Sequence, residues 1–240
     1  MHIPDGYLGP GTYGSFWAAT LALWYVAGRK LRKTVKAADA PLLALGAAAS
    51  FVVMMFNVPI MGGTSGHATG AMLLAAVLGP WAAFVCMSIA IAVQALLFGD
   101  GGITSYGANC FNMAFAGVFA GWTLYRLLAG RELLSSGEGK KETKTKKQKQ
   151  KILFAAGCGA YFGINVSALL TALELGIQPI LEKGADGRPL YSPFPLKVTV
   201  PALMAGHLTL FGFAEAAFTV LGISYILKSH PELIYGEHLK

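Results

Sequence analysis

Long apolar stretches alternate with short polar breaks along this chain. A helix of about 20 apolar residues is long enough to cross a lipid bilayer. The stretch at 71–98 is too long for one upright helix, and because Gly79-Pro80 interrupts it, two helices are predicted there. The pattern predicts an all-α polytopic membrane protein with about seven transmembrane helices, at about 13–27, 41–60, 71–78, 80–98, 109–128, 152–175 and 198–227.

The composition agrees with this membrane assignment. Of the 240 residues, 55% are hydrophobic and only 13% are charged, whereas about 25% are charged in a typical soluble domain. We expect a single membrane-embedded domain over residues 1–240. No basic leader or small-residue cleavage site precedes the first apolar stretch, so Met1 and His2 are expected to remain on the mature chain.

The distribution of positive charge predicts the topology. Seven helices put the two termini on opposite sides, and an outer N-terminus places 16 of the 19 Lys and Arg residues, with the C-terminus, in the cytoplasm. Most of them lie in 29–36 and in the low-complexity segment 130–151, which is expected to be a mobile cytoplasmic loop. The net charge of +7 then reflects topology and contact with the lipid bilayer, and no nucleic acid partner is expected.

The opening stretch "MHIPDGYLGP" is a candidate metal chelator. In segment 1–10, predicted to be extracellular, the Met1 amine and the His2 amide nitrogen can close a five-membered ring around an ion. The same amide and the His2 imidazole Nδ1 can close a six-membered ring. The amide must lose its proton, which late divalent ions favour. Three nitrogens in one plane with one further imidazole suit Ni(II) or Cu(II) better than zinc, magnesium or calcium.

His67, in "GGTSGHATG", is the expected fourth donor, because it lies on the same predicted side as the N-terminus. The alternative is a structural histidine that caps a turn or hydrogen-bonds in the core. His230 and His238 lie in the predicted cytoplasmic tail, on the wrong side. The metal ligands predicted from the residues are therefore Met1, His2 and His67.

Several other polar residues are candidates for contacts around this site. Side-chain amides can orient a metal-bound histidine or hold the N-terminal segment, although bonding between helices is an equal alternative. For His207 and for Glu215, eight residues later, bundle support is favoured, and Glu174 is more ambiguous. Asp100 is expected to cap a turn or to attract cations. The candidates for outer contacts are Asn57, Ser65, Asn109, Asn112 and His207.

Taken together, "MHIPDGYLGP", "GGTSGHATG" and "GDGGIT…GANCFNM" resemble the CbiM/NikM family, the substrate-capture (S) components of energy-coupling factor importers for cobalt and nickel. The resemblance covers about Met1 to Leu227, with the basic loop as a departure. It implies a planar site of four nitrogens: the Met1 amine, the His2 amide and imidazole, and the His67 imidazole. It also implies a prokaryotic cell membrane and three kinds of partner: a transmembrane coupling (T) subunit, cytoplasmic ATPase subunits and sometimes a small accessory membrane subunit.

The sequence contains no G-x-x-x-x-G-K-[ST] motif, so we expect no ATPase activity, no enzyme and no catalytic cofactor, with Ni(II) or Co(II) as substrate. A stand-alone secondary transporter or channel is the alternative, but it predicts a line of ionisable residues across the membrane. An intramembrane metalloenzyme ranks last, since no HExxH is present. Strong planar nitrogen donors favour nickel, although cobalt can use the same ligands.

Overall fold

The structure is a computed structural model that describes residues 1–60, 64–130 and 145–234, and it is mostly helical. Three π-helical segments, at 94–98, 110–117 and 207–211, each continue the preceding helix without a break. The longer helices and the short α5 are α1 (Pro10–Thr34), α2 (Ala40–Met54), α3 (Ala71–Leu78), α4 (Pro80–Val93), α5 (Tyr106–Asn109), α6 (Val118–Ala129), α8 (Lys146–Leu181), α9 (Leu196–Gly206) and α10 (Gly212–Ser229).

Four helical stretches are long and apolar enough to cross a membrane: Ala37–Met54, Pro80–Phe98, Lys146–Leu181 and Leu196–Ser229. The predicted helical, membrane-type fold is therefore confirmed. The number of spans and the sidedness stay predictions.

The helix α3 is shorter than a helix that crosses a bilayer by itself. With eight residues it is about 12 Å long, whereas the apolar core of a bilayer is about 30 Å thick. The extended segment 64–70 leads into α3 through the interior of the bundle. Glu215 of α10 accepts hydrogen bonds from the N–H groups of Thr69 (2.5 Å) and Gly70 (3.0 Å), so this non-helical backbone is satisfied by protein.

A small hairpin corrects the purely helical expectation. Strand β1 (Val58–Ile60) pairs antiparallel with β2 (Thr64–Gly66), and Pro59 lies opposite Ser65. Residues 58–60 are predicted to end the helix at 41–60, but α2 ends at Met54 and they form β1, while the glycine-rich break, predicted to be a turn, contains β2. Apolar stretches of only three residues are too short to show strand alternation. His67 follows β2 directly.

The predicted loop 130–151 also ends earlier than expected. Residues 131–144 of that loop lie outside the described residues. The chain is already helical from Lys146, because the Thr145 hydroxyl accepts from the Gln148 N–H (3.3 Å) and the Gln148 side chain accepts from the Thr145 N–H (2.7 Å). This capping box starts a helix in a segment whose Lys and Gln residues are good helix formers.

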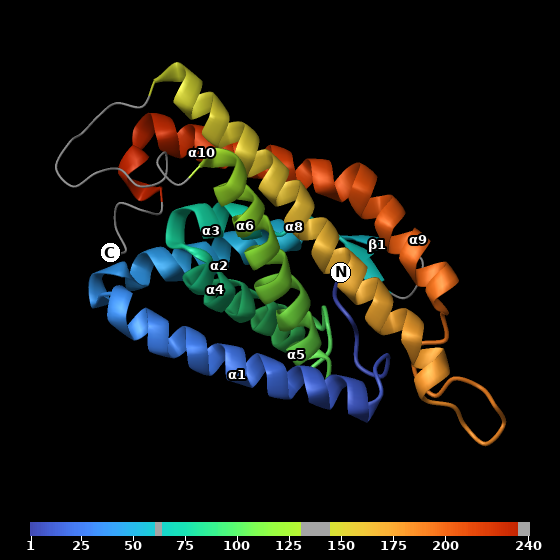
Figure 1. Ribbon diagram of the computed structural model, residues 1–240. Coiled ribbons are helices and arrows are strands. Elements are labelled where there is room, and N and C mark those ends of the chain that lie inside the picture. The colour runs from blue at the N-terminus through green and yellow to red at the C-terminus, as the bar shows by residue number, and fades with distance from the viewer. Residues whose placement is uncertain (61–63, 131–144, 235–240) are drawn as a thin grey trace.

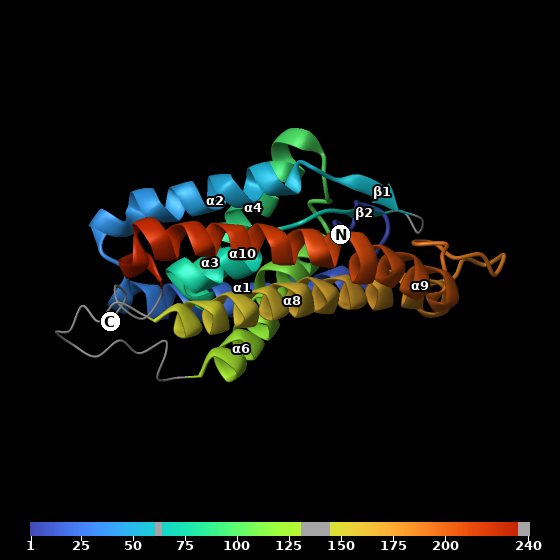
Figure 2. The same cartoon turned by 90° about the horizontal axis from the view of Figure 1, so that it is seen from above.

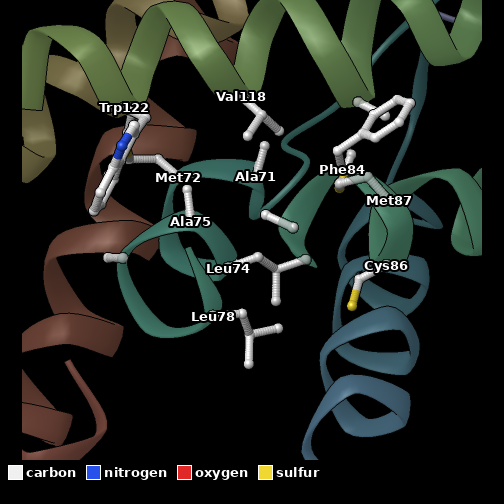
Figure 3. Packing of buried hydrophobic residues seen from close by; sticks show 14 of the residues in the cluster. Ala71, Met72, Leu74, Ala75, Leu78, Phe84, Cys86, Met87, Val118 and Trp122 are labelled. Atoms are coloured by element: carbon white, nitrogen blue, oxygen red, sulfur yellow. The ribbon is translucent and has the colours of Figure 1, made fainter. Parts of the chain in front are cut away.

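The core packs α3 against α4, α6 and α8. In Figure 3, Met72 of α3 lies beside Trp122 of α6, and Val118 points toward Ala71. Helices α6 and α8 approach closely at glycines: a Cβ on Gly159 would lie 2.7 Å from the carbonyl oxygen of Gly121. A side chain at either position would push the two helices apart.

The connections gather at the two ends of the bundle. Figures 1 and 2 place the N-terminus, the β1–β2 hairpin and the segment 182–195 at one end. The α1–α2 connection, the start of α8 and the end of α10 lie at the other end. The N-terminal segment, with Met1 and His2, and the hairpin that precedes His67 therefore meet at one end of the molecule.

Candidate metal centre

The N-terminal segment folds back into the bundle. Met1 is 0% and His2 is 2% exposed. The Ile3 N–H donates to Asn109 Oδ1 (2.8 Å), while the Ile3 carbonyl accepts from Asn109 Nδ2 (3.1 Å) and from the Gly102 N–H (2.9 Å). Asn109 thus bonds to main-chain groups of the segment in the way a neighbouring strand would, and these bonds set how far residues 1–2 reach inward.

Two further groups of contacts hold the rest of the segment. The Asp5 carboxylate accepts from the N–H groups of Ile103 (3.0 Å) and Thr104 (2.7 Å). Burial would raise the pKa of Asp5, but these hydrogen bonds outweigh it and keep the pKa below its usual value. The Gly9 N–H donates to Gln178 Oε1 of α8 (2.9 Å). The segment is therefore attached to the 99–105 loop and to α8.

Strand β2 lies alongside the first two residues. The Met1 amine donates to the main-chain carbonyl of Ser65, whose hydroxyl oxygen lies 3.5 Å away. The Thr64 hydroxyl donates to the His2 carbonyl (2.8 Å). Residues separated by about 64 positions are in this way brought into one buried cluster.

The imidazole rings of His2 and His67 are stacked in this cluster. Their centroids are 4.8 Å apart and their planes differ by 17°. Metal–nitrogen bonds are about 2.0 Å long, so rings this close allow one nitrogen of each to reach the same ion.

The surroundings of His67 select one of its two nitrogens. Its Nδ1 lies 3.0 Å from the carbonyl oxygen of Ala68, which can only accept, so we assign the proton to Nδ1. Within the described residues, its Nε2 is buried and has no hydrogen-bond partner. The Nε2 lone pair is therefore available to a metal ion.

Burial keeps these nitrogens neutral. Desolvation lowers the pKa of the Met1 amine to about 5, against the attraction of Asp100. Desolvation also lowers the pKa of His2, although Asp100 opposes this effect. It holds the pKa of His67 well below its usual value, and the nearby Met1 amine lowers it further. Metal ligands must be deprotonated, so at neutral pH the cluster is ready to bind an ion without losing protons from these groups.

Asp100 contacts the centre in a way the sequence reasoning missed. Its Oδ1 lies 3.2 Å from His2 Nδ1, and its Oδ2 accepts from Asn57 Nδ2 (2.8 Å). Asn57 therefore reaches His2 through Asp100. In the sequence, Asp100 is an acidic residue directly after an apolar helix, on the predicted side of the N-terminus. An acidic residue in that position is equally typical of a turn, so it did not indicate the contact with His2.

The remaining candidates lie farther from the two rings. Asn112 donates to Glu174 Oε2 (3.0 Å) and to the hydroxyl of Thr171 (3.3 Å), which itself donates to the Met1 carbonyl (3.5 Å). His207 bonds to Leu203 of its own helix (2.8 Å), and its ring packs 5.1 Å from that of Phe211. The structure thus joins Asn57, Ser65 and Asn109 to residues 1–3 and places Asn112 one contact further away.

The donor set available here is unusual. Across the ranges that the structure describes, no group of three or more His, Cys, Asp or Glu side chains is arranged to hold a metal ion. Side chains in this cluster offer two imidazoles. A four-coordinate site would take its other donors from the main chain, as the amine of Met1 and the amide of His2 can supply.

Comparisons with known proteins give a consistent result. The family described as CbiM, "Cobalt uptake substrate-specific transmembrane region", matches residues 2–233. The fused nickel transport protein NikMN of Rhodobacter capsulatus is 45% identical over 98% of the chain, which spans 64% of that protein's length. The cobalt transport protein CbiM of Chlorobium limicola is 40% identical over 53% of this chain and 51% of its own. A crystal structure described as a truncated transition metal transporter is 46% identical, with a TM-score of 0.86 over 96% of this chain and 100% of that one.

Proposed function

The chain belongs to the CbiM family of cobalt uptake substrate-specific transmembrane proteins, and from this we propose that it captures Ni(II) or Co(II) outside the cell for an ATP-driven importer of the energy-coupling factor type. The observation that carries the proposal is the buried meeting of the Met1 amine with the rings of His2 and His67. Family membership supports a role in nickel or cobalt transport. The relatives' names support both metals as substrates.

We propose four nitrogen ligands in one plane: the Met1 amine, the His2 amide, His2 Nδ1 and His67 Nε2. The first three are consecutive along the chain and form two fused chelate rings, which brings them into one plane. The hydrogen bonds of Ile3 to Asn109 hold the segment in place before the ion arrives. Such preorganisation favours tight binding, because little freedom is lost when the ion binds.

The rest of the proposal follows from the burial of this site. An ion bound among side chains that are almost fully buried leaves slowly, so import requires a conformational change driven by partners. We propose a transmembrane coupling subunit and cytoplasmic ATPases, with a small accessory membrane subunit in some assemblies. The chain would be one domain in a prokaryotic cell membrane, with segment 1–10 outside and residues 130–151 in the cytoplasm.

Metal analysis and absorption spectroscopy of the untagged chain test the site directly. We expect one nickel ion per chain and a weak visible band with no paramagnetism, because strong planar donors give low-spin Ni(II). A paramagnetic six-coordinate nickel would contradict the planar arrangement. Proton-driven nickel uptake by the purified chain alone in ATP-free liposomes would instead support a stand-alone secondary transporter.

The release of protons on nickel binding tests the amide ligand. Because the amine and both imidazoles are neutral at pH 7, only the His2 amide has a proton to lose, and we expect about one proton per ion. The affinity should rise about tenfold per pH unit near neutral pH, and should fall more steeply as the pH drops through the amine pKa of about 5.

Calorimetric titrations in buffers of different ionisation enthalpy count these protons. A release near zero at pH 7 would show that the His2 amide keeps its hydrogen and is not a ligand. A release near two would show that one of the other nitrogens is protonated in the empty site.

A further inference from the structure

Glu215 of α10 carries a buried carboxyl group that the proposed ligand set does not use. It is 1% exposed, and three hydrogen bonds join it to the extended segment that follows His67. Its Oε2 accepts from the N–H groups of Thr69 (2.5 Å) and Gly70 (3.0 Å), and its Oε1 accepts from the Thr69 hydroxyl (3.1 Å). Ionisable groups inside a membrane bundle are costly and mark candidate functional positions.

The peptide group between Ala68 and Thr69 connects Glu215 to His67. Its carbonyl oxygen, which belongs to Ala68, lies 3.0 Å from His67 Nδ1 and accepts the hydrogen assigned to that nitrogen. Its N–H, which belongs to Thr69, donates to Glu215. One planar peptide group therefore accepts a hydrogen bond from the imidazole at one edge and donates one to the carboxyl group at the other.

The next peptide group is held at both edges as well. Its N–H, from Gly70, donates to Glu215, and its carbonyl, from Thr69, accepts from the Ser50 hydroxyl of α2. Ser50 is 2% and Thr69 is 3% exposed, so water has little access to these bonds. The backbone directly after His67 is thus fixed by two helices that are distant from it in the sequence.

Hydrogen bonds in such a series also change the chemistry of the ring. Bonds in a chain polarise one another, so an acceptor at the Thr69 N–H makes the Ala68 carbonyl a stronger acceptor for the imidazole N–H. A partner of this kind fixes which ring nitrogen carries the hydrogen and raises the basicity of the other nitrogen. In His67 the other nitrogen is Nε2, which has no hydrogen-bond partner among the described residues.

We propose that Glu215 is a positioning residue of the metal site, which acts on His67 through the peptide group between Ala68 and Thr69. It keeps the hydrogen on Nδ1, fixes the direction of the ring and strengthens Nε2 as a donor to the ion. This inference rests on the proposed planar site and deepens it. Bundle support alone, the role favoured from the sequence, would require the contact of α10 with this segment but not its connection to the imidazole.

Nickel affinities of three variants of the full untagged chain test this role. Glu215→Met removes the acceptor with little change of volume and should lower affinity by about 10–100-fold. Glu215→Gln keeps an acceptor oxygen and should retain most of the affinity. An equal loss in both variants would overturn the requirement for an acceptor.

The matched control is Thr219→Val. It removes a buried hydroxyl one turn further along α10 that has no hydrogen-bond partner among the described residues. This variant should bind nickel as the unmodified chain does. A loss as large as that of Glu215→Met would show that any polar change in α10 weakens binding, and would overturn a specific role of Glu215.

The ¹⁵N NMR spectrum of the histidines in the empty chain separates positioning from a general structural effect. We expect a His67 Nδ1–H signal that exchanges slowly with water in the unmodified chain, shifts upfield in Glu215→Met and is unchanged in Thr219→Val. A contribution to folding alone would lower the unfolding temperature without moving this signal. If Glu215→Met does not fold, the unmodified chain still decides, because a His67 ring with its hydrogen on Nε2 would overturn the proposal.

The outcomes distinguish the two levels of inference. Failure of the unmodified chain to bind nickel through His67 Nε2 would overturn the proposed site, and the role of Glu215 in it. Binding through Nε2 with unchanged affinity and an unchanged Nδ1–H signal in Glu215→Met would overturn the role of Glu215 alone.

Discussion

Acetylating the Met1 amine should abolish nickel capture. The acetyl group turns the amine into a neutral amide nitrogen and adds no new amine, whereas one added glycine would create Gly-Met-His, which can bind nickel through its own amine, two amides and the His2 imidazole. There is also little space for the acetyl group, because Met1 is 0% exposed and its nitrogen bonds to the carbonyl of Ser65. Loss of a hydrogen-bond partner of a metal ligand lowers metal affinity by about 10–100-fold. We expect a larger fall here, because a ligand itself is lost.

Competition with a coloured nickel chelator measures this loss, and two controls accompany it. Acetylation of a lysine side chain, such as Lys197, should leave affinity unchanged. A cleavable N-terminal tag should block binding, and its removal back to Met1 should restore it. Thermal unfolding should differ little, since the hydrogen bonds of Ile3 and Asp5 remain available. Full affinity in the chain acetylated at Met1 would show that the amine is not a ligand.

The second large effect is expected for His67→Ala. This change removes the only donor in the proposed plane that does not come from the first two residues. His67 is fully buried, and its Nδ1 hydrogen-bonds to the carbonyl of the adjacent Ala68. We therefore expect the visible band of planar nickel to disappear and affinity to fall by at least about 100-fold, a larger effect than the loss of an outer partner, with the helical content retained.

The matched control is His230→Ala, which removes a histidine just after α10, at the other end of the bundle (Figure 1). That variant should bind nickel normally. A second variant, His67→Gln, keeps most of the side-chain volume and separates the loss of a donor from the creation of a cavity. If His67→Ala binds nickel with its affinity and spectrum unchanged, then the fourth ligand lies elsewhere.

Local patterns in the sequence were enough to predict much of the fold. Hydropathy depends on each segment alone, so the helices around 13–27, 80–98, 152–175 and 198–227 were predicted before any packing was known. Gly79-Pro80 ends one helix and begins the next, as predicted, with Gly79 at a φ of +80°. The chelating potential of Met1 and His2 was equally readable, because its donors are consecutive.

Other features depended on contacts between distant segments. The helix α3 is short because the chain enters the bundle as an extended segment, whose N–H groups are satisfied by Glu215, about 146 positions away. Hydropathy cannot show such a partner, and an apolar segment has the same composition whether it crosses the membrane or not. The start of α8 at Lys146 was missed because the capping box of Thr145 and Gln148 lies within a strongly charged run.

The sequence by itself therefore determined that this is a helical membrane protein with a chelator at its start, since both properties belong to neighbouring residues. Only the tertiary structure decided that His67 meets His2, and that Asp100 borders the same ring. These contacts are set by hydrogen bonds that hold the segments 1–9, 64–70 and 99–105 against one another. No local pattern encodes them, because each bond joins residues that are far apart in the chain.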